Sequence, residues 1–169
     1  MRNMGRAKIL LAVIVTASFA NTGAAETNSI GYSATVATGQ NTYVQSSNGT
    51  FGTILVGQSK IINNSVTLNN TGDVNATVDA RFNDSRNGTY GLVSGGFVLN
   101  ASNFALARTN ENLAVENMNV LSDSGSDVRI TIAQAFGAIT RLAARLSVPQ
   151  AQPAGDYRGT IILTFSNSE

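Results

Sequence analysis

Short segments in which apolar and polar residues alternate recur along most of this chain. The alternation is cleanest over residues 74–82, and a period of two residues is typical of a β-strand with one buried face. The expected buried face carries Val74, Ala76, Val78, Ala80 and Phe82, and the exposed face carries Asn75, Thr77, Asp79 and Arg81. Residues 60–68 are expected to form the preceding strand, and the turn residues 69–73 predict that the two strands make a hairpin at the centre of one sheet. A slip of one residue would bury Asp79 and Arg81, so we expect a fixed register.

Further strands are expected on both sides of this hairpin. They cover residues 30–38, 42–45 as a short continuation, 51–56, 97–99, 128–133 and 139–148, with turns at 46–49 and 83–91. Residues 100–108 fit either a short helix or a looped strand, and residues 109–127 indicate a loop with one strand inside. Residues 139–148 also fit a helical stripe, and we interpret them as a strand because a proline-containing corner follows.

Residues 148–165 predict how the fold closes. Both prolines of the chain lie here, at Pro149 and Pro153, where a fixed φ and a missing N–H suit a corner better than a strand. In the strand after the corner, one face carries Tyr157, Gly159, Ile161, Leu163 and Phe165. About eight or nine short strands without a long helical pattern predict an all-β fold, a single antiparallel β-sandwich of jelly-roll or immunoglobulin-like type, with this last strand at its edge.

The N-terminal residues 1–25 have the pattern of a cleaved secretory signal peptide. Basic residues precede the apolar run 9–20, and small residues lead up to an expected cleavage after Ala25. Two alternatives are a transmembrane anchor and the retained helix of a type IV pilin. The run is shorter than the roughly 20 residues that cross a bilayer, which favours secretion to the cell exterior. Residues 26–169 then form one β-sandwich domain, without a membrane span.

Composition limits the chemistry of this domain. The chain has no cysteine, histidine or tryptophan, which excludes disulfides, thiolate or imidazole metal ligands and Ser-His or Cys-His nucleophiles. After signal removal eight basic and ten acidic residues remain, a balance that argues against a nucleic-acid partner. No Ser-x-x-Lys motif is present. We therefore expect no catalytic, cofactor-binding or metal-binding residues, and a protein that is not an enzyme, although distant carboxylates that meet in a fold stay open.

Two kinds of surface site stand out. N-x-Ser/Thr triplets make candidate N-glycosylation sites at Asn48, Asn63, Asn69, Asn75, Asn83, Asn87 and Asn100; the alternative is that an Asn- and Thr-rich surface produces such triplets by chance. The acidic loops 123–127 and 83–87 offer oxygen atoms for calcium. Neither loop matches the calcium-loop pattern, so we interpret both as solvated turns.

The segment 30–38 has a second possible role. Its apolar face carries Ile30, Tyr32, Ala34 and Val36. Such a strand directly after a cleaved signal either completes its own sheet or leaves as a donor strand that adds to a neighbouring copy. Exchange between copies produces a head-to-tail filament, because a contact that does not close on itself propagates.

A family resemblance points the same way. The signal, the early alternating strand, residues 70–78 and the ending, which consists of Val148-Pro149 and residues 153–161, resemble secreted archaeal β-sandwich surface proteins. More remotely, they resemble TasA and camelysin-type biofilm fibre proteins and archaeal bundling pili. The ending is also similar to that of some chaperone-usher pilins, but this chain lacks their common cysteines. The resemblance implies subunits that polymerise by donor-strand exchange, with Ile30, Tyr32, Ala34 and Val36 in the donor role.

Two functions are therefore weighed. The first is an extracellular structural subunit of a filament or pilus, a homo-oligomer that also contacts cell-surface or matrix components. The second is a monomeric surface domain that binds carbohydrate or protein through its loops.

Overall fold

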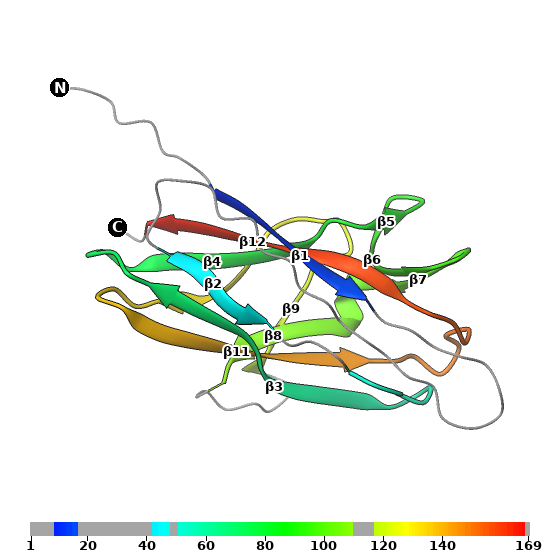
Figure 1. Cartoon of the computed structure of the whole chain (residues 1–169). Coiled ribbons are helices and arrows are strands. Elements are labelled where there is room, and N and C mark those ends of the chain that lie inside the picture. The colour runs from blue at the N-terminus through cyan, green and yellow to red at the C-terminus, as the bar shows by residue number, and fades with distance from the viewer. Residues whose placement is uncertain (1–8, 17–41, 48–50, 110–116, 168–169) are drawn as a thin grey trace.

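Two antiparallel β-sheets pack face to face around one core in the computed structural model (Figure 1), which describes residues 9–16, 42–47, 51–109 and 117–167. The first sheet contains β1 (Ile9–Thr16), β4 (Ala76–Phe82), β5 (Ser85–Arg86), β6 (Thr89–Ser94), β7 (Phe97–Asn100), β10 (Val128–Ala133) and β12 (Arg158–Asn167). The second sheet contains β2 (Thr42–Ser47), β3 (Ser59–Asn70), β8 (Phe104–Arg108), β9 (Asn119–Val120) and β11 (Ala138–Ser147). The predicted all-β sandwich is confirmed. The described residues form twelve strands rather than eight or nine, partly because β5 and β9 are two-residue pairings.

The strand order brings together segments that are distant in the sequence. The first sheet runs β10-β4-β12-β6-β5, with β1 also paired to β12 and β7 to β6, and the second runs β2-β3-β11-β8-β9. The core between the sheets includes edge-to-face aromatic contacts. The rings of Phe82 and Phe104 are 5.5 Å apart at 83°, and those of Phe51 and Phe104 are 5.9 Å apart at 89°. This geometry directs the positive ring edge at the negative ring face.

The alternation in β4 predicts its buried face well. Ala76, Val78, Ala80 and Phe82 are all buried. Val74 is the exception, because the strand begins only at Ala76 and Val74 lies 42 % exposed in the preceding turn. The inward position expected for Val74 is therefore wrong.

The hairpin expected between residues 60–68 and 74–82 is wrong too. β3 pairs with β2 and β11 in one sheet, and β4 pairs with β10 and β12 in the other. The buried Asn70 side chain holds the crossing between the sheets: its Nδ2 donates to the carbonyls of Val74 (2.9 Å) and Ala133 (3.1 Å), and its Oδ1 accepts from Gly72 N (3.0 Å). Each strand buries one face against the same core, so the alternation does not indicate which strand lies beside it.

Several other expectations are corrected or refined. Residues 51–56 form no strand; Phe51 and Ile54 enter the core from an irregular segment, while Leu55 and Val56 stay exposed. Residues 46 and 47 of the turn expected at 46–49 belong to β2 instead, and residues 48 and 49 lie outside the described residues. The segment 100–108 combines both options, a 3₁₀ turn at Ala101–Asn103 and then β8.

The strand interpretation of 139–148 is confirmed by β11, in which Leu142, Ala144 and Leu146 are buried. The candidate donor strand 30–38, with Ile30, Tyr32, Ala34 and Val36, lies outside the described residues.

Candidate assembly edge

A buried tyrosine fixes the corner that leads into β12. Tyr157 is fully buried, and its hydroxyl donates to the Pro153 carbonyl (2.7 Å) and accepts from Gln152 Nε2 (2.6 Å). Gln152 Nε2 also donates to the carbonyl of Val98 at 3.2 Å, which ties the corner to β7. A tyrosine that bonds back to a carbonyl a few residues upstream is a recurrent corner device of β-sandwiches. It sets where β12 begins.

One side of β12 is paired within the first sheet. Ile161 to Asn167 pair with Phe82 to Ala76 of β4, and Arg158 pairs with Val93 of β6. Between these ladders the carbonyl of Thr160 accepts from Asn83 N (2.8 Å), and its N–H donates to the Asp84 carboxylate. Backbone groups of successive strand residues point to opposite sides. Gly159, Ile161, Leu163 and Phe165 therefore direct their N–H and C=O groups to the other edge.

That other edge is occupied by β1. The register runs antiparallel from Ile9 opposite Phe165 to Thr16 opposite Arg158, over eight residues. β12 is therefore flanked by strands on both sides, and the expected edge position of this strand is wrong. In Figure 1, β1 lies along β12 on the outside of the sandwich.

The residues of β1 belong to the apolar run that the sequence predicts to be part of a signal peptide. Sequence reasoning did not assign this run as a strand, although its β-branched residues Ile9, Val13, Ile14 and Val15 are typical of strands. The positions of Ile9, Leu11, Val13 and Val15 lie opposite the core-facing residues of β12. The run therefore places an apolar residue at each of these four positions.

The candidate glycosylation sites differ in exposure. Asn63 in β3, Asn83 and Asn87 are exposed, and Asn87 has a left-handed φ of 51° in the turn between β5 and β6. Asn69 and Asn100 are half-buried within β3 and β7, so Asn69 is not in a turn as expected. Asn75 is half-buried before β4, where its Oδ1 accepts from Ala135 N at 2.9 Å. Asn48 lies outside the described residues. Access therefore favours Asn63, Asn83 and Asn87.

The carboxylates of the two acidic loops bind protein groups. The Asp123 carboxylate accepts from Ser102 N at 2.6 Å, and Asp127 forms an ion pair with Arg81 at 3.3 Å. Asp84 holds the start of β12 through Thr160 N. Among the described residues no group of three or more acidic side chains gathers as metal ligands would. In the structure these three carboxylates therefore bond to other segments of the chain.

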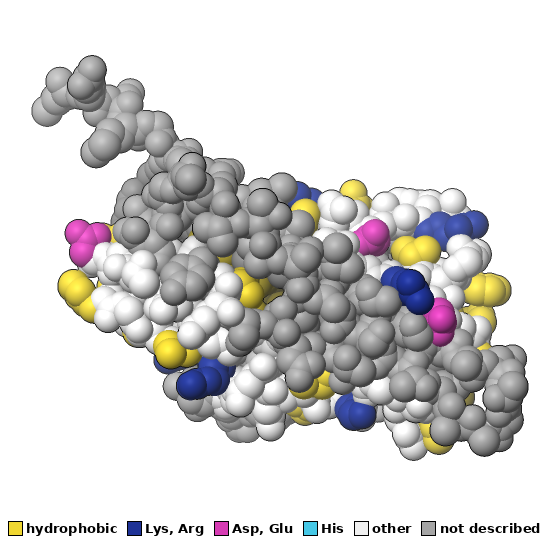
Figure 2. Space-filling model, in the orientation of Figure 1, with side chains coloured by type: hydrophobic (Ala, Val, Ile, Leu, Met, Phe, Trp, Pro, Cys, Tyr) yellow, Lys and Arg dark blue, Asp and Glu magenta, His cyan; other side chains and the backbone are white. Residues whose placement is uncertain are grey.

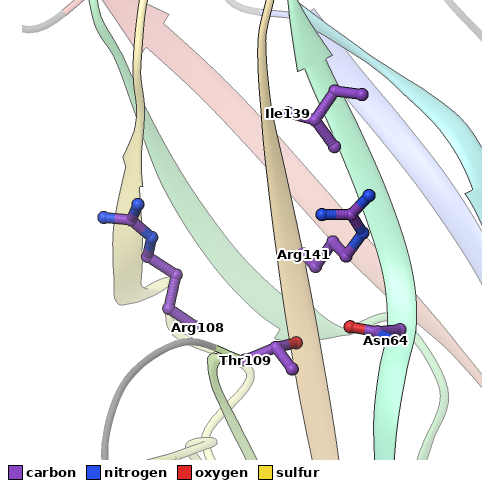
Figure 3. Close-up of a pocket in the computed structure, with 5 residues that line it drawn as sticks. All are labelled: Asn64, Arg108, Thr109, Ile139 and Arg141. Atoms are coloured by element: carbon purple, nitrogen blue, oxygen red, sulfur yellow. The ribbon is translucent and has the colours of Figure 1, made fainter.

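An open hollow of about 530 Å³ lies over the second sheet, lined by Asn64, Arg108, Thr109, Ile139 and Arg141 (Figure 3). Figure 3 shows the Arg108 and Arg141 side chains extending from neighbouring strands, with Thr109 between their bases. Asn64 has a left-handed φ of 54° where the pairing of β3 with β11 is irregular. The polar groups that line the hollow are cationic or neutral, so this lining favours an anionic ligand.

The fold and this edge define a class, a two-sheet β-sandwich whose last strand has one side completed by the N-terminal apolar run. Comparisons with protein-family models, with curated proteins and with solved structures found no match for the chain. In the described part of the chain, no helix combines the length and apolar character needed to cross a membrane.

Proposed function

We propose that this protein is a secreted, non-catalytic structural subunit that polymerises at the cell surface by donor-strand addition. The observation that carries the proposal is the occupant of the outer β12 edge. That edge pairs with Ile9–Thr16, a run that the sequence predicts to be removed on secretion. Signal cleavage would leave a strand-length vacancy beside the core.

The vacated edge would be unfavourable if left open. Four residues of β12, Gly159, Ile161, Leu163 and Phe165, would lose the backbone partners on that side, and buried or half-buried N–H and C=O groups need such partners. The same residues face the core, where Ile161, Leu163 and Phe165 are each about 1 % exposed with β1 in place. A long apolar edge of this kind binds another strand readily.

The mature chain supplies a candidate for the vacancy. Residues 30–38 alternate, with apolar residues at four successive alternate positions, the number of alternate positions at which the apolar β1 run lies opposite Gly159, Ile161, Leu163 and Phe165. Strand addition combines main-chain hydrogen bonds with side-chain packing on one face. Interactions of this type suit a secreted chain without cysteine, because they need no disulfide.

The test begins with the protein secreted by an exporting host. N-terminal sequencing of this product should give a start at Glu26, and sizing with negative-stain microscopy should show filaments or large multimers. A variant lacking residues 26–38 should stay monomeric, and a matched variant lacking only 26–29 should still assemble. If the intact secreted protein is a stable monomer at high concentration, the proposal fails.

A second candidate function is a monomeric surface domain that binds an anionic glycan or acidic protein segment. The paired arginines of the hollow favour it. Replacing Arg108 and Arg141 by alanine should then abolish retention of the protein on an immobilised acidic polysaccharide, while Arg158→Ala, distant from the hollow, should not. Equal retention of both variants would refute this candidate.

A further inference from the structure

The two ends of the sandwich can be identified by the chain segments they carry. At one end, here called the turn end, lie Thr42 opposite Asn70, the β10–β11 turn with Phe136, and the C-terminal end of β12, where Asn167 pairs with Ala76. At the other end, the corner end, lie the start of β12, the Tyr157 corner and the β6–β7 turn. In Figure 1, β2 starts at the same end of the molecule at which β12 finishes.

We propose that residues 30–38 occupy the β12 edge of the next copy, antiparallel, so that subunits join with the turn end of the donor against the corner end of the acceptor. The inference rests on the proposed function and adds to it the geometry of the subunit contact. It follows from how far the chain can reach.

In the structure this edge pairs with an antiparallel strand, β1, and the proposed donor strand keeps that direction. If Ile30, Tyr32, Ala34 and Val36 take the positions of Ile9, Leu11, Val13 and Val15, Val36 lies opposite Gly159 at the corner end. The same chain must then return to Thr42 at the turn end. Along β12 that return covers about 27 Å, at roughly 3.3 Å per residue, and the sheets are about 10 Å apart.

Six residue steps separate Val36 from Thr42, and they extend over at most about 20–22 Å. An antiparallel donor strand in this register is therefore too far from its own Thr42. Within one chain a parallel pairing fits instead, with Ile30 at the corner end and residue 38 near Thr42. Between two copies the same short connection suffices, and it places the turn end of the donor within about 20 Å of the acceptor's corner end.

Both ends carry exposed apolar side chains that such a contact would cover. At the turn end, Phe136 is 85 % exposed and Val74 is 42 % exposed. At the corner end, Phe97 and Leu55 are each 53 % exposed, and the bonds of Gly57 N to Val148 O and of Val148 N to Gln58 O hold the 55–58 segment there. Figure 2 shows hydrophobic side chains at both ends of the visible face.

Phe136 is presented by a fixed backbone. It adopts a left-handed φ of 59°, which is uncommon for an aromatic residue. Phe136 N donates to Gly72 O (2.8 Å) and Gly137 N donates to Asn70 O (2.7 Å), which holds the turn in this conformation. A rigid exposed aromatic side chain is a typical anchor for a protein contact. Two unlike ends in contact give an open, head-to-tail chain of subunits.

Cysteine cross-linking tests the geometry, because the chain has no cysteine of its own. In the proposed register Thr35 lies opposite Thr160, the position that Ile14 holds in β1. Secreted proteins carrying only Thr35→Cys or only Thr160→Cys are mixed, assembled and oxidised, and a disulfide between them requires two copies. The double variant T35C/T160C should give a ladder of covalent multimers on a non-reducing gel. The matched double variant G31C/T160C, which would pair in the parallel arrangement, should give none.

The outcomes separate the two proposals. A monomer with an internal disulfide in G31C/T160C overturns both the inference and the filament. Filaments in which Thr35 and Thr160 do not cross-link overturn the antiparallel end-to-end contact and leave the filament standing. As an independent measurement, Phe136 is replaced by asparagine, a residue that tolerates a left-handed φ. The Phe136→Asn variant should assemble several-fold more slowly than the unchanged protein. The Ile132→Thr variant, changed on the side of β10, should assemble at the unchanged rate. Equal assembly rates for the two variants would refute the end-to-end contact.

Discussion

Removal of the Tyr157 hydroxyl tests the corner on which the position of β12 depends. The change Tyr157→Phe keeps the fully buried ring and deletes one oxygen, so the core loses almost no volume. It removes the 2.7 Å bond to the Pro153 carbonyl and the 2.6 Å bond from Gln152 Nε2. Pro153 is exposed, so water can replace part of the lost bonding at its carbonyl.

The expected cost follows from these two contacts. A net contribution of about 0.5–1.5 kcal/mol for a hydrogen bond, with partial replacement by water, gives a loss of about 1–2 kcal/mol for Tyr157→Phe. In a chain of this length that corresponds to a decrease in Tm of roughly 3–6 °C. The expected slope of the unfolding free energy with urea is unchanged, because the same surface is exposed on unfolding.

The measurement is urea unfolding of the full chain, residues 1–169, retained inside the expression host. Tyr90→Phe is the control, since the Tyr90 hydroxyl has no hydrogen bond with any part of the chain that the structure describes. A Tyr157→Phe protein within about 0.3 kcal/mol of the unchanged chain would refute the role of the corner. A double-mutant cycle with Gln152→Ala should give a coupling energy of about 0.5–1.5 kcal/mol, which identifies the contact responsible.

Three further changes test the rest of the fold by the same urea measurement. Asn70→Ala removes three hydrogen bonds of a side chain that is 1 % exposed and leaves the glycosylation triplet of Asn69 intact. The free energy of unfolding should fall by about 2–3 kcal/mol. A decrease below about 1 kcal/mol would contradict the role of Asn70 at the crossing between the sheets. Gly91→Ala places a Cβ 2.1 Å from a backbone oxygen of β7, at a residue whose φ is 154°. The free energy of unfolding should fall by about 3 kcal/mol or more. The control Gly96→Ala places its Cβ in open space and should leave the stability unchanged. Arg129→Ala should cost less than about 1 kcal/mol despite its 2.5 Å contact with Asp79, because the arginine side chain is 58 % exposed; a larger loss would indicate a stronger ion pair.

Alternation predicted burial better than it predicted neighbours. The inward faces of β4, β11 and β12 follow the sequence, because a period of two residues reports which face of a strand avoids water. The false hairpin between residues 60–68 and 74–82 shows the limit. Its turn residues suit a tight hairpin and a crossing between sheets equally well, and in the structure the Asn70 side chain bonds to Val74 and Ala133 across the crossing.

Elements without alternation were the hardest to predict. Phe51 and Ile54 reach the core from an irregular segment, so their apolar character was mistaken for a strand. The hollow between Arg108 and Arg141 could not be expected either, because it depends on the pairing of β8 with β11 across more than thirty residues. The corner at Tyr157 was expected from two prolines and a glycine, but its hydrogen bonds to Gln152 and Pro153 were not.

The apolar run at residues 9–16 illustrates why one composition supports two interpretations. Export signals and buried strands both need a short run of apolar residues, and β-branched residues suit both. The structure pairs this run with the last strand of the chain, along the edge that faces away from β4. If secretion removes the run, the edge loses an eight-residue strand, and residues 30–38 are long enough to replace it with apolar residues at every second position. The length of the connection between Val36 and Thr42 then determines whether the protein assembles. A parallel pairing lets residues 30–38 fill the edge of their own subunit and gives a monomer. An antiparallel pairing places them on the edge of the next subunit and gives a filament.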